Sequence, residues 1–202
     1  MGVAMGVVKI DPALMALRRW AVAHNRANLA APCNRLAAQS PVGRWRALAG
    51  PTGEANLYAV LPRNRVLCLA QGEVDRDACL LLQLAAVLAV GSRALWTVDE
   101  RPLWEILPPP VKDRVALVKD WTRESVSFDA VLHHGAPAAL LAVCRAVAAR
   151  PGPIVGVIGL GLGAGIDAGD IDIPLERLVL ERSLSVNTAA GGNASLMTLG
   201  MA

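Results

Sequence analysis

Aromatic side chains are scarce in this chain of 202 residues, which contains five Trp, one Tyr and one Phe. Hydrophobic residues nevertheless make up 54% of the sequence, so Ala, Leu and Val are expected to fill the core. That balance is typical of layered helix and sheet packing and disfavours an aromatic-rich β-sandwich. It also excludes disorder throughout, and the length fits one domain, or one domain with tails.

No C-x-x-C pair and no His at metal-binding spacing accompany the four cysteines, so we expect no metal site. Cys68 and Cys79 lie in apolar runs and are interpreted as buried thiols in a reducing cytosol, which predicts a cytoplasmic protein. The longest uncharged apolar stretch, residues 78–92, is shorter than the roughly twenty residues that a bilayer requires. We therefore expect no membrane span, and the N-terminal order of charge and apolar residues excludes a signal peptide.

Acidic residues are almost missing from residues 1–50, where Asp11 stands alone. Seven basic residues and one acidic residue give this segment a charge of +6. Because the net charge of the chain is +3, the remaining residues carry −3. Such a segment binds nucleic acid or an acidic partner, or it is a helical face whose acidic partner surface lies elsewhere. We favour the helical face and expect no nucleic acid, because no DNA-reading motif is present. The basic residues are Lys9, Arg18, Arg19, Arg26, Arg35, Arg44 and Arg46.

Helix and strand signals alternate along most of the chain. Asp11-Pro12 and Asp75 are good helix starts, Gly91 is a good helix end, and continuous apolar runs indicate buried strands. This alternation predicts an α/β fold with a parallel sheet flanked by helices on both faces. In chain order we expect a helix over 11–29, a loop over 31–56, strands over 56–61 and 65–70, a helix from Asp75 or Asp77 to Gly91, a strand over 93–97, helical segments over 102–107 and 111–121, a strand over 128–132, a helix over 137–149 and strands over 154–158 and 175–181.

A glycine-rich segment follows the expected strand over 154–158. Gly159, Gly161 and Gly163 would let a dinucleotide pyrophosphate approach backbone amides. No ten-residue helix follows them, and the segment comes after the last strand of the series, where the dinucleotide fingerprint normally follows the first. We favour a flexible connection, and keep these glycines as candidate cofactor-binding residues.

Two adjacent histidines, His133 and His134, follow the expected strand over 128–132. The carboxyl end of a parallel strand is where α/β sites lie, and imidazoles there can serve acid–base chemistry. No carboxylate or nucleophile in the sequence is clearly paired with them, so we favour loop histidines. No nucleophile elbow, Walker loop or metal triad is present, and we expect no catalytic residue in this chain.

Two stretches resemble a known family. One comprises residues 50–58 (GPTGEANLY), 61–63, 65–70 (RVLCLA) and 83–96, and the other is the closing segment 178–200 (LVLERSLSVNTAAGGNASLMTLG). They are similar to the C-terminal region of long proline utilization A proteins, with the elements in the same order over about residues 50–200.

The resemblance implies a role in proline catabolism. Members of the family oxidise proline to pyrroline-5-carboxylate with FAD, and oxidise glutamate semialdehyde to glutamate with NAD, passing the intermediate through an internal tunnel. The longer members carry a further domain of aldehyde dehydrogenase ancestry, which has a Rossmann-like core and a β-flap. It is non-catalytic, stabilises the dehydrogenase region and seals the tunnel.

This comparison implies three segments: an N-terminal helical segment and linker over 1–49, a Rossmann-like domain over 50–174, and a flap strand with a C-terminal motif over 175–202. Aldehyde dehydrogenases typically have Lys-Pro-x-Glu after the strand that here ends in Trp96-Thr-Val-Asp-Glu100, so the ribose-contacting lysine is absent. The nucleophilic cysteine of the catalytic half is absent too. FAD and NAD are therefore expected in the parent protein, and no cofactor in this chain.

The expected partners are the aldehyde dehydrogenase and proline dehydrogenase regions of the same parent protein. The closing segment is poor in core-forming residues, so it is either a mobile tail or lies against another surface. Its small residues permit close backbone approach and predict the tunnel-sealing contact. Two alternatives stay open: a nucleotide-binding dehydrogenase-like enzyme, and an oligomerisation module, such as a homodimer, whose hairpin over 175–181 extends a neighbour's sheet. The interface residues expected are Arg182, Ser183, Asn187, Gly191, Gly192, Asn193, Ser195, Met197 and Gly200.

Overall fold

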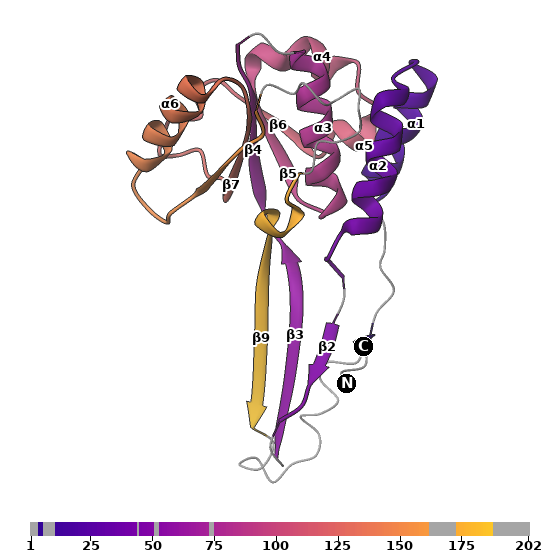
Figure 1. The fold of residues 1–202 in the computed structure, drawn as a ribbon, viewed down its shortest axis with the longest axis vertical. Coiled ribbons are helices and arrows are strands. Elements are labelled where there is room, and N and C mark those ends of the chain that lie inside the picture. The colour runs from indigo at the N-terminus through magenta and orange to yellow at the C-terminus, as the bar shows by residue number, and fades with distance from the viewer. Residues whose placement is uncertain are drawn as a thin grey trace.

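The computed structural model describes residues 4–5, 11–43, 45–50, 53–72, 75–161 and 173–187, which form two sheets and their helices (Figure 1). A five-stranded parallel sheet has the order β6-β5-β4-β7-β8, and a four-stranded antiparallel sheet has the order β1-β2-β3-β9. The strands are β1 Ala4–Met5, β2 Trp45–Leu48, β3 Glu54–Pro62, β4 Arg65–Ala70, β5 Arg93–Thr97, β6 Val115–Val118, β7 Ala130–His134, β8 Gly156–Gly159 and β9 Val179–Asn187. The α-helices are α1 Pro12–Ala23, α2 Ala27–Gln39, α3 Arg76–Ala89, α4 Arg101–Glu105, α5 Pro109–Lys112 and α6 Pro137–Ala148, and short 3₁₀ turns cover Val98–Glu100 and Leu175–Leu178.

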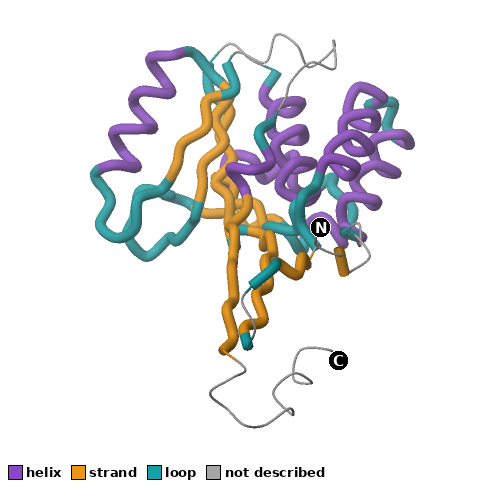
Figure 2. The backbone as a smooth tube through the Cα atoms, turned by 60° about the horizontal axis from the view of Figure 1, so that its bottom comes forward, coloured by secondary structure: helices purple, strands orange, loops and turns teal. Residues whose placement is uncertain are grey.

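The parallel sheet separates two hydrophobic clusters, because successive side chains of a strand point to opposite faces. On β4, Val66 and Cys68 join the cluster of α1, α2 and α3, whereas Leu67 and Leu69 join Val143 of α6. Helix α3 is buried between the sheet and the α1–α2 pair, while α6 lies on the other face (Figures 1 and 2). The expected α/β fold with a Rossmann-like parallel sheet flanked by helices is confirmed.

The strand order reverses at β4. The chain builds β4, β5 and β6 outward in one direction, then returns to place β7 and β8 on the other side of β4. All neighbouring strands in this sheet are parallel, so their carboxyl ends meet at one edge. The reversal puts a topological switch point between β4 and β7, where open α/β sheets generally bind ligands.

The antiparallel sheet forms a flap that protrudes from the parallel sheet (Figure 1). Strands β3 and β9 pair from Glu54↔Asn187 to Pro62↔Val179, and β2 pairs with the other side of β3. The protruding flap that was expected as a β-hairpin is thus present, but it is a sheet and not a hairpin, because its long strands β3 and β9 come from residues far apart in the sequence. Arg63 fixes its base, because the backbone amide of Arg63 donates to the carbonyl of Leu178 over 3.1 Å.

Helix α3 follows the expected start and end signals. The carboxylate of Asp75 accepts a hydrogen bond from the amide of Ala78 over 3.0 Å and caps the helix. Gly91 adopts φ +80° just beyond the end of the helix, a conformation that is inexpensive only for glycine. The expected strands over 65–70 and 93–97 also match β4 and β5.

The expected loop over 31–56 is wrong. Helix α1 ends at Ala23, and a second helix, α2, runs to Gln39 with Pro32 inside it. Proline removes one backbone donor, but Leu29, Cys33 and Leu36 recur at helical spacing and are buried against the core. Burial of that face therefore outweighs the cost of the proline. Strands β1 and β2 were missed as well, and pairing with β3 stabilises β2.

Further boundaries differ from the sequence expectations, among them that of β8, which covers Gly156–Gly159 where a strand over 154–158 was expected. Residues 111–121 are not helical throughout, because β6 forms there and pairs with β5. Strand β7 lies two residues later than expected and includes His133 and His134. The expected strand over 175–181 begins as a 3₁₀ turn, and β9 then extends to Asn187. In each case pairing with a distant strand sets the limits, which local sequence patterns do not reveal.

Candidate functional site

Two histidines occupy the switch point between β4 and β7. His133 and His134 are both fully buried in the last two positions of β7. His133 Nε2 lies 3.0 Å from Gln71 Oε1 on the segment after β4. On the other face of the strand, Gln83 Nε2 of α3 donates to His134 Nδ1 over 2.7 Å and to the carbonyl of Leu69 over 2.9 Å. With Gln83 Nε2 as the donor, His134 Nδ1 is the acceptor, whereas His134 Nε2 and Gln83 Oε1 are buried and have no hydrogen-bond partner among the described residues.

Burial keeps both imidazoles neutral. It lowers the pKa of His133, and it lowers the pKa of His134 to about 4, with the neighbouring His133 as a second cause. The expectation that they are loop histidines is wrong, since both are strand residues. Acid–base catalysis also has little support, because neither ring is open to a substrate and each is held by a glutamine amide.

Local packing and backbone conformation explain why glycine is needed at the two described candidate cofactor positions. A Cβ on Gly159 would lie 2.5 Å from Leu140 Cδ2, so this glycine permits close packing of β8 against α6. Gly161 adopts φ +67°, and its carbonyl accepts a hydrogen bond from the amide of Gly135 over 2.7 Å. Gly163, the third candidate, lies outside the described residues. Both described positions fit a turn that joins β8 to the end of β7.

The buried cysteines are poor nucleophiles. Burial raises the pKa of the Cys33 thiol to about 12 and that of Cys79 to about 11, and it also raises the pKa of Cys68. Cys68 and Cys79 are buried as expected. Within the described ranges, no three His, Cys, Asp or Glu side chains are grouped as a metal site requires. No described helix is long and apolar enough to cross a membrane.

The two faces of the flap differ in polarity. Residues paired in register across an antiparallel sheet share a face. Trp45, Ala59 and Arg182 form one such row, Ala47, Leu57 and Leu184 form the next, and Leu61 pairs with Leu180. We call this the apolar flap face, defined by Trp45, Ala47, Ala55, Leu57, Ala59, Leu61, Leu180, Arg182, Leu184 and Val186.

Large apolar groups on this face are open to solvent. Trp45 is 43% exposed, Leu180 47% and Leu184 50%. Three of the four β9 positions on this face, Leu180, Leu184 and Val186, are apolar, and the fourth is Arg182, a pattern that fits a strand with one covered face. An exposed apolar sheet face of this kind marks a protein contact.

The opposite face of the flap carries a polar network. The Tyr58 hydroxyl is hydrogen bonded to the Glu181 carboxylate, which raises the pKa of Tyr58. The Ser185 hydroxyl donates to Asn56 Oδ1, and Asn56 Nδ2 lies 3.4 Å from Glu54 Oε2. Leu48, which is 44% exposed, also lies on this face through its pairing with Asn56. Most side chains here are nevertheless polar and bond to one another, so the apolar flap face is the better candidate for a partner.

The expected interface residues divide between the two faces. Arg182 lies on the apolar flap face, whereas Ser183 and Asn187 lie on the polar one. The remaining expected positions, Gly191, Gly192, Asn193, Ser195, Met197 and Gly200, are outside the described residues. No sequence signal led us to expect Trp45, Leu180 and Leu184 as contact residues. The alternation of Leu180, Arg182, Leu184 and Val186 was the signal that could have found the β9 part.

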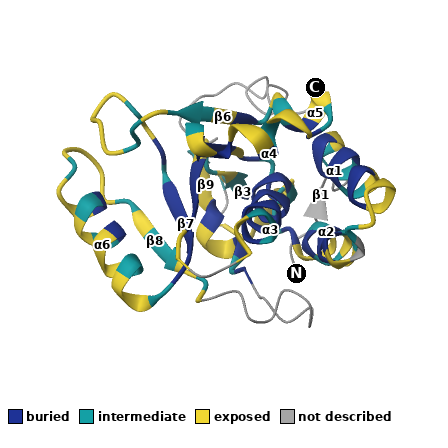
Figure 3. Cartoon of the chain, turned by 90° about the horizontal axis from the view of Figure 1, so that it is seen from above, coloured by how far each residue is buried: buried dark blue, intermediate teal, exposed yellow. Residues whose placement is uncertain are grey.

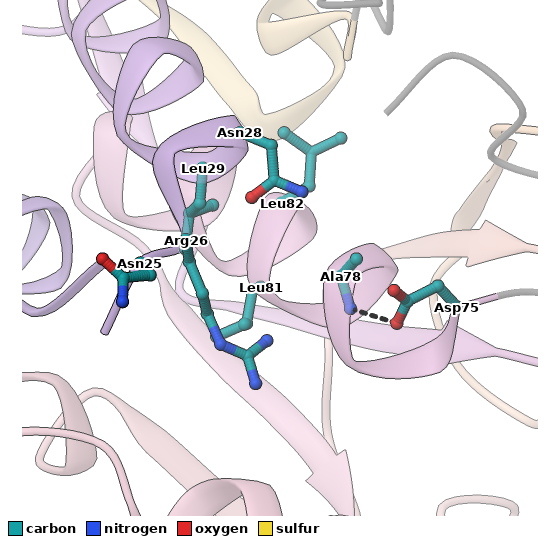
Figure 4. Close-up of a pocket in the computed structure, with 8 residues that line it drawn as sticks. All are labelled: Asn25, Arg26, Asn28, Leu29, Asp75, Ala78, Leu81 and Leu82. Carbon is teal, nitrogen blue, oxygen red and sulfur yellow. Dashed lines mark hydrogen bonds between the residues drawn. The ribbon is translucent and has the colours of Figure 1, made fainter. Parts of the chain in front are cut away.

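A pocket of about 170 Å³ lies where the α1–α2 turn meets α3 (Figure 4). Its acidic lining residue, Asp75, is occupied in capping α3. Arg26 lies 3.9 Å from Asp77 and over the Trp20 ring. These polar groups serve the packing of the helices, so the pocket is a weaker candidate than the flap.

Comparisons with known proteins point to one group. No family model matches the chain. The bifunctional protein PutA of Escherichia coli is 50% identical over 190 residues, which are 93% of this chain and 14% of that protein. The Rhizobium meliloti protein of the same name is 36% identical over 197 residues, 96% of this chain and 16% of its own length. The chain therefore spans about one seventh of the curated relatives it matches.

Solved structures show the same fold. A proline utilization A (PutA) structure from Bradyrhizobium japonicum has a TM-score of 0.50 and 21% identity, covering 67% of this chain and 15% of its own. A putative aldehyde dehydrogenase from Burkholderia cenocepacia has a TM-score of 0.52 and 15% identity, covering 77% of this chain and 40% of its own. The chain thus has an aldehyde dehydrogenase-like fold and is homologous to one segment of proteins named bifunctional protein PutA.

Proposed function

We propose that this chain is a non-catalytic domain in proline catabolism, which packs on an aldehyde dehydrogenase region and closes the passage for its intermediate. Its 50% identity to one segment of a bifunctional PutA supports the assignment to such an assembly. The whole protein then holds FAD and NAD in its other regions and acts in the cytoplasm. Pyrroline-5-carboxylate and glutamate semialdehyde are the intermediates that the passage retains.

The observation that carries this proposal is the apolar flap face. Trp45, Leu180 and Leu184 are each more than two-fifths exposed, although exposed apolar rows of this kind are costly in water. The flap projects from the parallel sheet, so it can reach a neighbouring surface without moving the core (Figure 1). Packing that surface against a dehydrogenase region removes apolar area from water and excludes water from a passage beneath it.

The switch point supports a structural role. Where related folds take a ligand, this chain places two buried, neutral histidines and two glutamines that bond to them. The three cysteines with raised pKa values are protonated at neutral pH. These features make catalysis by the described residues a poor fit, whereas they suit a rigid core that supports the flap.

A chimaera tests the proposal. This chain replaces the matching segment of the Escherichia coli PutA, and one sample carries Leu184→Asp while its matched control carries Ser183→Asp. The two neighbours lie on opposite faces of the same strand, so only the first alters the apolar flap face. We expect Leu184→Asp to lower coupled proline-to-glutamate turnover and to increase the pyrroline-5-carboxylate captured by an external trap, with Ser183→Asp close to the parent chimaera.

Equal behaviour of the two chimaeras would contradict docking through this face. Because Leu184 is half exposed and loses its cross-strand contact with Leu57, its substitution should change the stability of the isolated chain by no more than about 1 kcal/mol. Thermal unfolding of the isolated variants checks that the loss of coupling does not come from unfolding.

A second candidate role is oligomerisation. Strand β9 is the last strand of the flap sheet, and within the described ranges no strand pairs with its outer edge. Such an edge can extend the sheet of a neighbouring copy. Sedimentation velocity of the isolated chain separates the two roles, because a dimer that Leu184→Asp leaves intact and that breaks on placing a proline in β9 would favour this one.

A further inference from the structure

Helix α6 is apolar on every side although much of it is exposed. Arg145 is the one charged residue in α6, and only Val143 and Val147 are buried. Figure 3 shows α6 largely exposed, at the end of the molecule opposite α1 and α2. A helix that is hydrophobic all round is normally covered on all sides in the complete protein. Its exposed apolar residues are Ala138, Leu141, Ala142 and Ala148.

The strand beside α6 has an unprotected edge. Strand β8 is the last of the parallel sheet, and among the described strands only β7 pairs with it. Strand β8 itself (GVIG) and the residues up to Gly161 contain no charge and no proline, the usual guards of an edge strand, although Pro151 and Pro153 stand just before Ile154. The other edge strand, β6, is flanked by Arg114 and Lys119. Ile154 is 102% exposed, which leaves a large apolar group entirely in water.

The helix and the strand form one continuous surface. A pocket of about 400 Å³ lies between them, lined by Cys144, Ala148, Ile154, Val155 and Val157 among others. We call the combination the α6–β8 surface, defined by Leu141, Cys144, Arg145, Ala148, Ile154 and Val157. It is separate from the flap, which is built from β1, β2, β3 and β9.

The charge of this surface indicates what covers it. Residues 137–161 include Arg145 and Arg150 and no acidic residue. Arg150 is occupied by the carbonyls of Trp121 and Arg123, whereas Arg145 is exposed and forms no ion pair with a described residue. A second copy across a twofold axis would bring the same uncompensated arginine to the interface. A carboxylate on a different surface would neutralise it.

We propose that the α6–β8 surface is a second docking site, and that its occupant is an apolar, strand-forming segment with a carboxylate opposite Arg145, supplied by the remaining part of the longer polypeptide. This inference rests on the proposed function, in which the chain works as one segment of a larger protein. The Escherichia coli relative supports that source, because the chain matches only 14% of its length. The segment pairs with the free edge of β8 and covers Ile154.

Two variants and one matched control test this site in the Escherichia coli chimaera and in the isolated chain. The variants are Ile154→Asp and Arg145→Glu, and the control is Ile106→Asp, which makes the same change at an exposed isoleucine outside the surface. We expect both variants to lower the melting temperature of the chimaera by about 3 °C or more and that of the isolated chain by less than about 1 °C. Ile106→Asp should leave both proteins unchanged.

Hydrogen exchange provides a second readout that does not depend on any variant. We expect the amides of residues 156–159 to exchange at least about tenfold more slowly in the chimaera than in the isolated chain. Equal exchange, or equal melting shifts for Ile154→Asp and Ile106→Asp, would overturn the proposal. A dimer of the isolated chain that Ile154→Asp dissociates would overturn it in favour of a second copy.

The failure of this inference differs from the failure of the proposed function. If Leu184→Asp releases intermediate while the α6–β8 variants behave as the control, the flap docks and this second site does not. If the chimaera leaks intermediate as freely with the wild-type chain as without it, the proposed function itself fails.

Discussion

The guanidinium carbon of Arg150 lies 4.6 Å from the centroid of the Phe128 ring. The same guanidinium donates to the carbonyls of Trp121 over 2.6 Å and Arg123 over 2.8 Å, and also to that of Val126. One side chain from the end of α6 therefore closes the loop between β6 and β7 over the smaller hydrophobic cluster. The Arg150 guanidinium thus donates hydrogen bonds to three carbonyls and also makes a cation–π contact with one ring.

Replacing Arg150 with lysine should destabilise the isolated chain by about 1–3 kcal/mol, because a point charge cannot reproduce the planar fork. Urea unfolding measures the change. Arg145→Lys is the matched control, since Arg145 is exposed on α6, shortly before Arg150 in the chain, and lacks a comparable set of acceptors, and it should stay within about 0.5 kcal/mol. Similar losses for both variants would contradict the role assigned to Arg150.

The buried histidines predict a loss of stability in acid. The pKa of His134 falls from 6.5 to about 4 on folding, so the unfolded chain binds the proton first as the pH decreases. Its contribution is complete above about pH 6.5 and is lost progressively down to about pH 4, by about 3 kcal/mol in all. The lowered pKa of His133 acts in the same direction.

His134→Gln should reduce this pH dependence, because glutamine does not titrate. Urea unfolding at several pH values between 4 and 7 checks it, with His24→Gln as the control at an exposed histidine. An unchanged slope for His134→Gln would show that other groups govern the acid transition.

The isolated chain should not bind NAD. Calorimetric titration to millimolar NAD is expected to give no saturable heat, because buried side chains occupy the switch point. Gly161→Ala should cost about 1 kcal/mol of stability through its φ of +67° and leave the titration unchanged. Saturable micromolar binding that Gly161→Ala abolishes would make the glycine turn a phosphate site and favour the enzyme alternative.

Truncation separates the flap strand from the closing motif. Ending the chain after Asn187 preserves every pair between β3 and β9, so the melting temperature should stay within about 2 °C. In the chimaera, the same truncation should increase the intermediate captured by the trap if residues 188–202 help to seal the passage. Ending the chain after Arg182 removes the outer half of β9, and should also destabilise the flap.

Local signals predicted the parts of the fold that local chemistry determines. Asp75 and Gly91 marked the ends of α3, and continuous apolar runs marked β4 and β5. Helix α2 was not predicted because proline, here Pro32, normally breaks a helix. The burial of Leu29, Cys33 and Leu36 explains why the helix nevertheless forms. Pairing with β5 similarly explains why β6 is a strand, although the sequence pattern predicted a helix there.

The candidate site was harder to predict because it is made by non-local pairing. The family resemblance predicted a flap, and Arg182, Ser183 and Asn187 do lie on it. Trp45 was assigned to a loop, and it joins Ala59 and Arg182 only through the register of three strands. The sequence does not reveal which residues lie side by side across strands separated by more than a hundred positions.

Pairing between residues 54–62 and 179–187 has a consequence for synthesis. The ribosome completes β3 long before β9, so a nascent chain carries a bare edge along the whole of β3 until its last strand emerges. Contacts of such high sequence separation form late and slowly. The β3–β9 pairs are therefore expected to form last among the described contacts, and docking through the complete flap can only follow the emergence of β9.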